Sequence, residues 1–128
     1  MKKFNKVYLA GGMHNNWRKR VIDSCKEFCF DFYNPEDHGL ISPDDYSAWD
    51  LHFIKQCDIL FAYMDKDNPS GWGLMLEIGY AKALNKTIIF VWEQLGDRDK
   101  YFEIAGFCAD VRFLDLNMGI KFLQSFEF

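Results

Sequence analysis

Two short, uninterrupted apolar runs constrain the fold of this chain more than any other feature. Residues 58–63 (Asp-Ile-Leu-Phe-Ala-Tyr) and 87–92 (Thr-Ile-Ile-Phe-Val-Trp) lack the alternation of polar and apolar side chains that marks a half-buried strand. Short runs that are apolar throughout are typical of strands covered on both faces, which occur mainly in parallel sheets. A parallel sheet needs helices on its faces, and segments with helical spacing do separate these runs.

Strand and helix patterns alternate along the whole chain. Further strands are predicted at residues 6–10, 30–33 and 111–114, and helices at residues 17–30, 43–57, 74–84, 99–108 and 117–124. This alternation predicts a three-layer α/β/α sandwich, one domain over residues 1–128, with a five-stranded parallel sheet in the flavodoxin-like order 2-1-3-4-5. Ligands of such sheets bind beyond the carboxyl ends of the strands, where the order reverses. We therefore expect the site at residues 11–16 and 65–73, which follow the first and third strands.

Composition narrows the class of partner. The 128 residues are 49% hydrophobic and 18% aromatic, and 15 basic against 19 acidic side chains give a net charge of −4. A mildly acidic chain lacks the positive surface that binds nucleic acid or an anionic membrane. No run approaches the roughly 20 apolar residues of a membrane helix, and the first residues form no signal segment. We therefore expect a cytoplasmic protein that binds neither nucleic acid nor membrane.

The four cysteines favour the same compartment. Cys25, Cys29, Cys57 and Cys108 form no Cys-x-x-Cys pair and lie in apolar periodic segments. This pattern indicates buried free thiols in a reducing cytoplasm. Cys25 and Cys29 are four positions apart and can share a helix face, so a metal site completed by a histidine is the alternative. We expect no metal and no cofactor.

The segment 69–81 (Pro-Ser-Gly-Trp-Gly-Leu-Met-Leu-Glu-Ile-Gly-Tyr-Ala) carries the sharpest chemical signal. A glycine-rich loop that leads into a helix offers free N–H groups and the positive end of the helix dipole to a ligand. We expect Glu77 in the first turn of that helix, where the dipole favours its ionised form. The simpler interpretation is a surface glutamate that complements the dipole. Against it, Glu77 is the only charge among apolar neighbours, and burying a carboxylate without a purpose or partner is costly.

Three motifs in register resemble the nucleoside 2-deoxyribosyltransferase family. They are Tyr8-Leu-Ala-Gly-Gly, Asp50-Leu-His-Phe-Ile-Lys-Gln-Cys-Asp58 and the segment 69–81 with Glu77, and they span residues 6–92. The resemblance implies a flavodoxin-like sandwich that forms a homodimer or higher homo-oligomer and acts on a nucleoside or nucleotide and a free nucleobase. In the family, the glutamate at the Glu77 position attacks the anomeric carbon of a 2'-deoxynucleoside. A second base or water then resolves the covalent deoxyribosyl ester.

The resemblance also implies roles for other residues. Asp50 matches an aspartate that protonates and orients the leaving base, and Tyr8 matches a tyrosine that hydrogen-bonds the catalytic glutamate. Taken alone, Asp50 is more simply explained by a solvated helix face, and Tyr8 by core packing. The further candidates for substrate binding lie in the expected loops: Gly11, Gly12, Asn34, Asp37, His38, Ser70, Gly71, Trp72 and Gly73. A plain tight turn explains the first glycine pair equally well, and Trp72 either stacks on a base or covers its loop.

The sequence departs from the well-studied transferases at one position. They carry an aspartate six residues before the nucleophile, where this chain has Gly71 beside Ser70. The related hydrolases of 2'-deoxynucleoside 5'-monophosphates have a serine in this region. Arg18 follows Gly12 closely enough to bind a 5'-phosphate, although an arginine at a helix start is usually solvated. The aromatic residues 126–128 either complete a neighbouring subunit's pocket or pack on their own domain.

Alternatives to sugar transfer come from three classes of protein. One is an N-glycosidase that passes the sugar of a (deoxy)nucleoside 5'-monophosphate to water; the loop and glutamate are also similar to cytokinin-type phosphoribohydrolases. Another is a non-catalytic nucleotide sensor that keeps the pocket. The last is a flavodoxin- or response-regulator-like module, which we rank lowest. Residues 9–13 (Leu-Ala-Gly-Gly-Met) contain neither the paired acids of a phospho-acceptor site nor a hydroxyl-rich flavin-phosphate loop.

Overall fold

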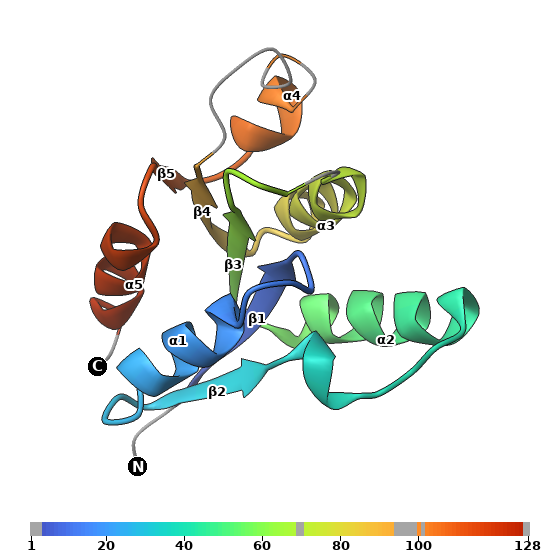
Figure 1. Cartoon of the computed structure of the whole chain (residues 1–128), viewed down its shortest axis with the longest axis horizontal. Coiled ribbons are helices and arrows are strands. Elements are labelled where there is room, and N and C mark those ends of the chain that lie inside the picture. Colours follow the sequence, from blue (N-terminus) through green and yellow to red (C-terminus); the bar gives the residue numbers. More distant parts are fainter. Residues whose placement is uncertain (1–3, 69–70, 94–99, 101, 127–128) are drawn as a thin grey trace.

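The computed structural model describes residues 4–68, 71–93, 100 and 102–126. At its centre is a parallel sheet in the order β2-β1-β3-β4-β5, as the sequence predicts (Figure 1). The strands are β1 (Asn5–Gly11), β2 (Phe30–Tyr33), β3 (Ile59–Met64), β4 (Thr87–Trp92) and β5 (Val111–Phe113). Every strand pair is parallel, so the carboxyl ends of all strands lie at the same edge.

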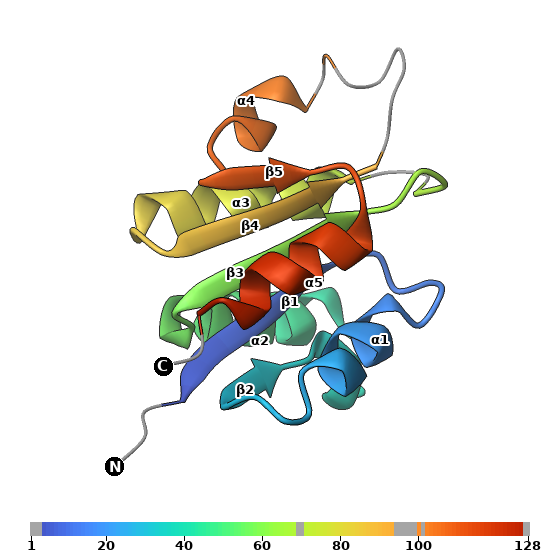
Figure 2. The ribbon, with the colours of Figure 1, turned by 90° about the vertical axis from the view of Figure 1, so that its left-hand side faces the viewer.

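Helices cover both faces of this sheet. The helices are α1 (Trp17–Ser24), α2 (Pro43–Gln56), α3 (Trp72–Ala83), α4 (Glu103–Gly106) and α5 (Leu116–Gln124). Figures 1 and 2 show α1 and α5 on one face and α2 and α3 on the other, with α4 beside α3. A short 3₁₀ helix, η1 (Pro35–Asp37), lies between β2 and α2. The predicted three-layer α/β/α sandwich is confirmed.

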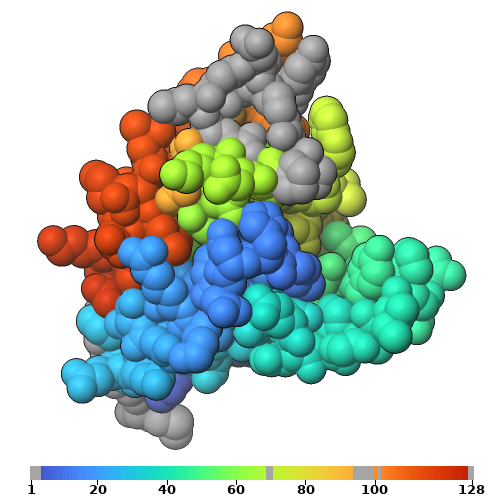
Figure 3. Space-filling model, in the orientation of Figure 1, coloured from blue at the N-terminus to red at the C-terminus, as the bar shows by residue number. Residues whose placement is uncertain are grey.

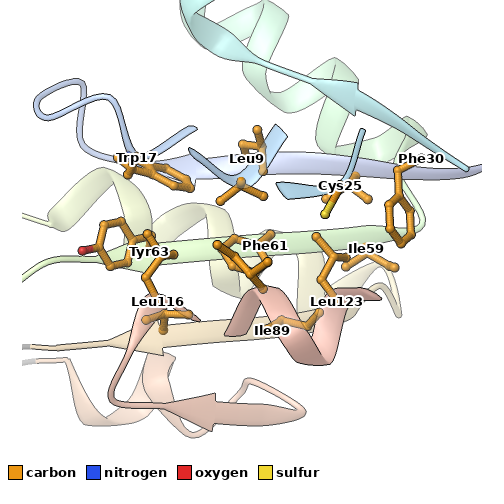
Figure 4. Packing of buried hydrophobic residues seen from close by; sticks show 14 residues of the cluster. Leu9, Trp17, Cys25, Phe30, Ile59, Phe61, Tyr63, Ile89, Leu116 and Leu123 are labelled. Carbon is orange, nitrogen blue, oxygen red and sulfur yellow. The ribbon is translucent and has the colours of Figure 1, made fainter. Parts of the chain in front are cut away.

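Successive side chains of β3 point into opposite helix layers. Phe61 and Tyr63 pack among side chains of α1 and α5 (Figure 4), whereas Leu60 and Met64 pack among those of α2 and α3. Every residue of β3 is buried, because each face of the strand is covered by a helix layer. This two-sided burial is the reason that the segment reads as a continuous apolar run.

Local signals place the start of α2 where the sequence predicts it. Ser42 is the N-cap residue, and Pro43 occupies the first helical position, where its missing N–H costs no hydrogen bond. Asp44 and Asp45 lie in the first turn, where they complement the helix dipole. Asp58, between α2 and β3, has a structural role, because its Oδ2 accepts a hydrogen bond of 2.8 Å from the backbone N–H of Lys6.

Three helix boundaries differ from the prediction. Helix α1 ends at Ser24 rather than at residue 30, because residues 25–29 are needed to turn the chain back into the parallel strand β2. Helix α3 begins at Trp72, before the predicted residue 74, because Gly71 takes a left-handed conformation and serves as the N-cap. Of the helix predicted at 99–108, the structure contains α4; residues 94–99 and 101 lie outside the described part.

All four cysteines are free thiols. Cys25 and Cys57 are buried as predicted, whereas Cys29 and Cys108 are partly exposed. Within the described residues, no group of three or more His, Cys, Asp or Glu side chains is placed to hold a metal ion. None of the helices in the described part of the chain is both long and apolar enough to span a membrane.

Candidate active site

A cavity of about 300 Å³ opens beyond the carboxyl ends of β1 and β3, between α2 and α3. This is the point where the strand order reverses and where the sequence predicts the site. Its volume is at the lower end of the range for small-molecule sites. The described residues that line it are Gly11, Gly12, Tyr46, Ser47, Asp50, Leu51, Asn68, Gly71, Gly73, Leu74, Leu76 and Glu77. Figure 3 shows the loops after β1 (blue) and β3 (yellow-green) side by side on this face.

Glu77 enters the cavity from the second turn of α3. The predicted first-turn position is wrong, because the helix begins at Trp72. Burial and the charge of Asp50 raise the pKa of Glu77 from its ordinary value of 4.5 to about 7, against the opposing effects of the Tyr8 hydroxyl and the Arg18 charge. Protonated and ionised forms of Glu77 therefore coexist near neutral pH, because desolvation opposes the ionised form that the helix dipole favours.

Asp50 lines the same cavity from α2. Burial raises the pKa of its carboxyl group, while hydrogen bonding to Tyr8 and the electrostatic effects of His38 and Arg18 lower it. The cavity thus contains two carboxyl groups, on Asp50 and Glu77, whose pKa values are both raised by burial. Coupled acids of this kind titrate as a pair near the pH range in which general acid–base and nucleophilic chemistry operate.

Tyr8 connects these two carboxyl groups to strand β1 of the sheet. It is fully buried in β1, and its ring packs at a tilt against that of Trp49, with 6.4 Å between the centroids. Burial and the charges of Glu77 and Asp50 raise the pKa of Tyr8, so the phenol stays protonated. Its hydroxyl donates a hydrogen bond of 3.2 Å to Oε2 of Glu77. The expected hydrogen bond is present, and its part in catalysis stays a prediction.

Three glycines leave room for this cavity. A Cβ atom on Gly11 would lie 2.5 Å from the carbonyl oxygen of Tyr63, and one on Gly12 would lie 2.6 Å from Cε1 of His14. Gly71 has a φ of +107°, and a Cβ there would overlap the terminal methyl of Met64. No larger residue fits these positions without rearrangement. The backbone therefore requires glycine at Gly11 and Gly71 whatever ligand the cavity takes, whereas at Gly12 the exposed His14 side chain can move aside.

Asp65 ties together the two loops that border the cavity. Its Oδ2 accepts a hydrogen bond of 2.7 Å from Nδ2 of Asn15 and lies 2.6 Å from Nε2 of His14. Its Oδ1 accepts one of 2.8 Å from the backbone N–H of Asp67. No role was predicted for Asp65. The available signal was an acidic residue directly after a fully buried strand, at the edge where the ligand loops meet.

Arg18 has a different environment from the one expected. It is 1% exposed, and it donates hydrogen bonds of 3.1, 2.8 and 2.8 Å to the carbonyl oxygens of Leu9, Gly11 and Gly12. Its Nη1 also lies 3.2 Å from Oε1 of Glu36. The guanidinium therefore holds the end of β1 and the loop that follows. It is not among the cavity-lining residues, so we no longer expect it to bind a phosphate.

Two predicted residues after β2 lie away from the cavity lining. Asn34 is the N-cap of η1, and its side chain accepts a hydrogen bond of 3.0 Å from the backbone N–H of Glu36. Asp37 is exposed at the end of the same 3₁₀ helix. These positions favour a structural role for Asn34, because a capping side chain is engaged by the backbone.

The predicted residues of the glycine-rich loop have separate outcomes. Gly71 and Gly73 line the cavity. Trp72 is 64% exposed and its ring lies 5.3 Å from that of Phe102, which agrees with a side chain that covers the loop. Ser70 lies outside the described residues. Gly73 shows no atom within 4 Å of an added Cβ, so its place in the lining is not required by packing.

Some lining residues were not predicted. Tyr46, Ser47 and Leu51 share the cavity-facing side of α2 with Asp50. The signal was available for Tyr46 and Ser47, because residues three and four positions before a helical residue lie on the same face as that residue. Asn68 is also buried at the cavity, in the turn after β3. Its side chain direction depends on the loop conformation, which no periodic pattern specifies.

The sequence and the fold of this chain are similar to those of known proteins. Residues 7–118 match the family model described as nucleoside 2-deoxyribosyltransferase. The fold is similar to a 2-deoxyribosyltransferase from Bacillus psychrosaccharolyticus (20% identity, TM-score 0.68, 96% of this chain and 93% of that chain). It is also similar to a 2-desoxiribosyltransferase from Leishmania mexicana (17%, 0.75, 97% and 99%) and to a CMP N-glycosidase from Clostridium botulinum (23%, 0.63, 94% and 99%). No curated protein sequence matches the chain.

Proposed function

Because the chain belongs to the nucleoside 2-deoxyribosyltransferase family, we propose that it cleaves the N-glycosidic bond of a 2'-deoxynucleoside and transfers the sugar to a second nucleobase. The observation that carries the proposal is the Tyr8–Glu77 hydrogen bond at the wall of the cavity between α2 and α3. Asp50 supplies a second carboxyl group to the same cavity. A nucleophile and an acid in one small cavity are what a two-step glycosyl transfer requires.

In the first step, an oxygen of the Glu77 carboxylate attacks the anomeric carbon. The bond between this carbon and the base nitrogen breaks, and its electron pair goes to the base. Asp50 gives its proton to the leaving base and becomes a carboxylate. The product is a deoxyribosyl ester of Glu77. Burial raises the pKa values of both Asp50 and Glu77, and the two carboxyl groups titrate as a coupled pair. The reactive form of this pair carries the proton on Asp50 and the charge on Glu77.

In the second step, a nitrogen of the incoming base attacks the anomeric carbon of the ester. The ester C–O bond breaks, and its electron pair returns to Glu77 as the carboxylate. The proton displaced from the incoming base goes to Asp50, which restores the starting state. Two displacements at the same carbon leave its configuration unchanged. Water in place of the second base gives hydrolysis.

Tyr8 prepares the nucleophile in this scheme. Its hydroxyl is a permanent donor to Oε2 of Glu77, since burial keeps the phenol protonated. The hydrogen bond stabilises the carboxylate form and holds the side chain in one orientation, so Oε1 is the oxygen left for attack. A buried carboxylate without such a donor would be protonated at neutral pH and would not be a nucleophile.

The charges of the cavity favour an unphosphorylated substrate. Asp50 and Glu77 are acidic, and the described lining residues include no lysine or arginine. Arg18, the expected phosphate ligand, is engaged by backbone carbonyl groups. A 5'-phosphate carries about two negative charges, and its binding needs basic groups or several backbone donors. We therefore propose a 2'-deoxynucleoside as the substrate, with 5'-monophosphates as the alternative that the experiment below separates.

Apolar residues next to the cavity support the expected homodimer or higher homo-oligomer. Leu76 lines the cavity and is 66% exposed, and Trp72, on the preceding turn of α3, is 64% exposed. Exposed large apolar side chains that lie together are typical of protein interfaces. We propose that a second copy covers this side of α3. Light scattering coupled to size-exclusion chromatography tests it, and a monomer at all concentrations contradicts it.

The activity is tested by chromatography of reaction mixtures. The purified protein is incubated with a panel of 2'-deoxynucleosides and their 5'-monophosphates, with and without adenine as acceptor. A new deoxynucleoside that forms only with the acceptor supports transfer, and free base released without it indicates hydrolysis. Consumption of the monophosphates alone favours the N-glycosidase alternative. Saturable binding with every substrate intact favours a sensor and contradicts the proposal.

The nucleophile is tested with matched glutamine variants. Glu77→Gln removes the attacking oxygen while keeping the shape of the side chain, so we expect activity to fall by roughly 10³-fold or more. Glu27→Gln changes an exposed glutamate after α1 and should leave the rate unchanged. Intact-protein mass spectrometry during turnover should detect the deoxyribosyl ester in the wild type only. Full activity in Glu77→Gln would contradict the assignment of Glu77 as the nucleophile.

A further inference from the structure

Two buried polar atoms without hydrogen-bond partners face each other behind the cavity. Nε2 of His38 lies 3.8 Å from Oδ1 of Asp50. Among the described residues, neither atom has a hydrogen-bond partner. The His38 side chain is only 8% exposed. An unpaired buried donor or acceptor costs about 1–3 kcal/mol, so a facing pair of such atoms next to a candidate acid calls for a functional explanation.

The surroundings of His38 decide which ring nitrogen carries the proton. Nδ1 accepts a hydrogen bond of 2.8 Å from the backbone N–H of Leu40. Nδ1 therefore bears no proton, and in the neutral ring the proton is on Nε2. The ring also packs edge-on against Trp49, with 4.8 Å between the centroids. His38 is thus held in one orientation, with its only donor directed toward Asp50.

We infer that His38 is a positioning residue that holds Asp50 with its Oδ1 turned away from the substrate and its Oδ2 directed to the cavity, where it protonates the leaving base. The inference rests on the proposed function, in which Asp50 is the acid. Asp50 lines the cavity while its Oδ1 is buried against His38. The donor at Nε2 favours Oδ1 as the acceptor, so the proton of Asp50 stays on Oδ2, the oxygen that serves the cavity.

A hydrogen bond between His38 and Asp50 forms as the reaction proceeds. In the ground state the 3.8 Å separation exceeds a hydrogen bond. When the Oδ2 proton passes to the base nitrogen, the electron pair of that O–H bond stays on Asp50, which becomes a carboxylate. The Nε2–H group then donates to a charged oxygen, which makes a shorter and stronger bond. The proton of His38 stays on Nε2 throughout, because the ring has no second proton to pass on.

The other groups that act on Asp50 come from three further elements. They are Tyr8 of β1, Arg18 of α1 and Glu77 of α3. Burial raises the pKa of Asp50, and His38 is among the groups that lower it. Removal of the imidazole therefore leaves Asp50 a weaker acid whose pKa is higher still. Tyr8, Arg18 and Glu77 are unchanged by such a variant, so the difference reports on His38.

The test compares two substitutions with a control on α2. His38→Phe keeps a ring against Trp49 but has no donor, whereas His38→Gln places an amide N–H near the position of Nε2. We expect kcat for the 2'-deoxynucleoside to fall about 10- to 100-fold in His38→Phe with little change in KM. The alkaline limb of the kcat profile should move to higher pH, and His38→Gln should restore most of both. His52→Gln changes an exposed histidine that packs on Phe53 and should match the wild type.

A measurement on the protein without substrate separates this inference from the proposed function. Carbon-13 NMR of the Asp50 carboxyl group, assigned by its loss in Asp50→Asn, should show a higher pKa in His38→Phe than in the wild type. Nitrogen-15 NMR of the wild type should show a proton on Nε2 of His38. Equal Asp50 titrations in both proteins, or a proton on Nδ1, overturn the inference. If the wild type is inactive but shows the lower Asp50 pKa and the proton on Nε2 of His38, the result counts against the proposed function alone.

Discussion

The hydroxyl of Tyr8 in β1 donates a hydrogen bond of 3.2 Å to Oε2 of Glu77 in α3, although the two residues are 69 positions apart. The parallel topology brings them together, because β1 pairs directly with β3, and α3 follows β3 in the chain. Within the cavity this bond opposes the desolvation that raises the pKa of Glu77 to about 7. The reactivity of Glu77 therefore depends on a residue from the first strand.

Tyr8→Phe should move the acid limb of the pH–rate profile to higher pH. In the wild type, kcat/KM should rise as pH increases through about 7, because the Glu77 carboxylate forms over that range. Loss of the Tyr8 donor removes an effect that lowers the pKa of Glu77. The measurement is kcat/KM across roughly pH 5 to 9. Tyr33→Phe, at the register partner of Tyr8 on β2, is the control, and an unmoved limb in Tyr8→Phe contradicts the prediction.

Glu77→Gln should stabilise the protein above neutral pH. In the folded state the pKa of Glu77 is about 7, against an ordinary value of 4.5. Below about pH 4.5 both states are protonated; between the two pKa values only the unfolded state ionises, so wild-type stability falls as pH rises. Above about pH 7 the full penalty, up to about 3 kcal/mol, is present.

Glutamine carries no charge at any pH, so the loss of stability that comes from ionising a buried Glu77 is absent in the variant. Urea unfolding of both proteins at about pH 4 and pH 8 measures the difference. The stability advantage of the variant should be small at the lower pH and largest at the higher pH. A constant difference between Glu77→Gln and the wild type at both pH values would show that Glu77 ionises with an ordinary pKa in the folded protein.

Arg18→Met should destabilise the fold without selecting between substrates. The substitution removes the Arg18 donors to the carbonyl groups of Leu9, Gly11 and Gly12, of which Gly12 keeps the indole N–H of Trp17. We expect a loss of about 2–4 kcal/mol in the free energy of unfolding. KM for the nucleoside and for its 5'-monophosphate should change by the same factor. A KM increase confined to the monophosphate would restore the phosphate-binding hypothesis. Arg20→Met, at an exposed position of α1, should stay within about 0.5 kcal/mol.

Gly71→Ala and Gly79→Ala should have opposite effects, although both lie in or at α3. Gly71 has a φ of +107° and contacts the buried Met64, so alanine there is strained; we expect a loss of about 1–3 kcal/mol and reduced activity. Gly79 is within the helix, with no atom within 4 Å of an added Cβ, and alanine should add about 0.5–1 kcal/mol of stability. Thermal unfolding of both variants measures this, and equal effects would contradict the account of Gly71.

Much of the fold follows from local patterns. The apolar segments of β3 and β4 predict two-sided burial, and burial on both faces requires the parallel three-layer arrangement that is observed. The Ser42-Pro43 start of α2 is likewise a local signal. The end of α1 was predicted too late, because the apolar spacing continues through residues 25–29 although the chain must turn there to enter β2. Periodicity reports which side chains are buried and carries no information about that turn.

The sequence by itself determined the sheet, the edge at which the loops gather, and the two carboxyl groups of Asp50 and Glu77 as candidates. Residue types and spacing suffice for the sheet, its loop edge and Glu77, because these depend on burial patterns within each segment. Asp50 was a candidate only through its match to the family motif. Only the tertiary structure decided the pKa of Glu77, the engagement of Arg18 by carbonyl groups, and the approach of His38 to Asp50. Desolvation and hydrogen bonding act over a few ångströms between segments far apart in the chain, and those distances exist only once the chain has folded.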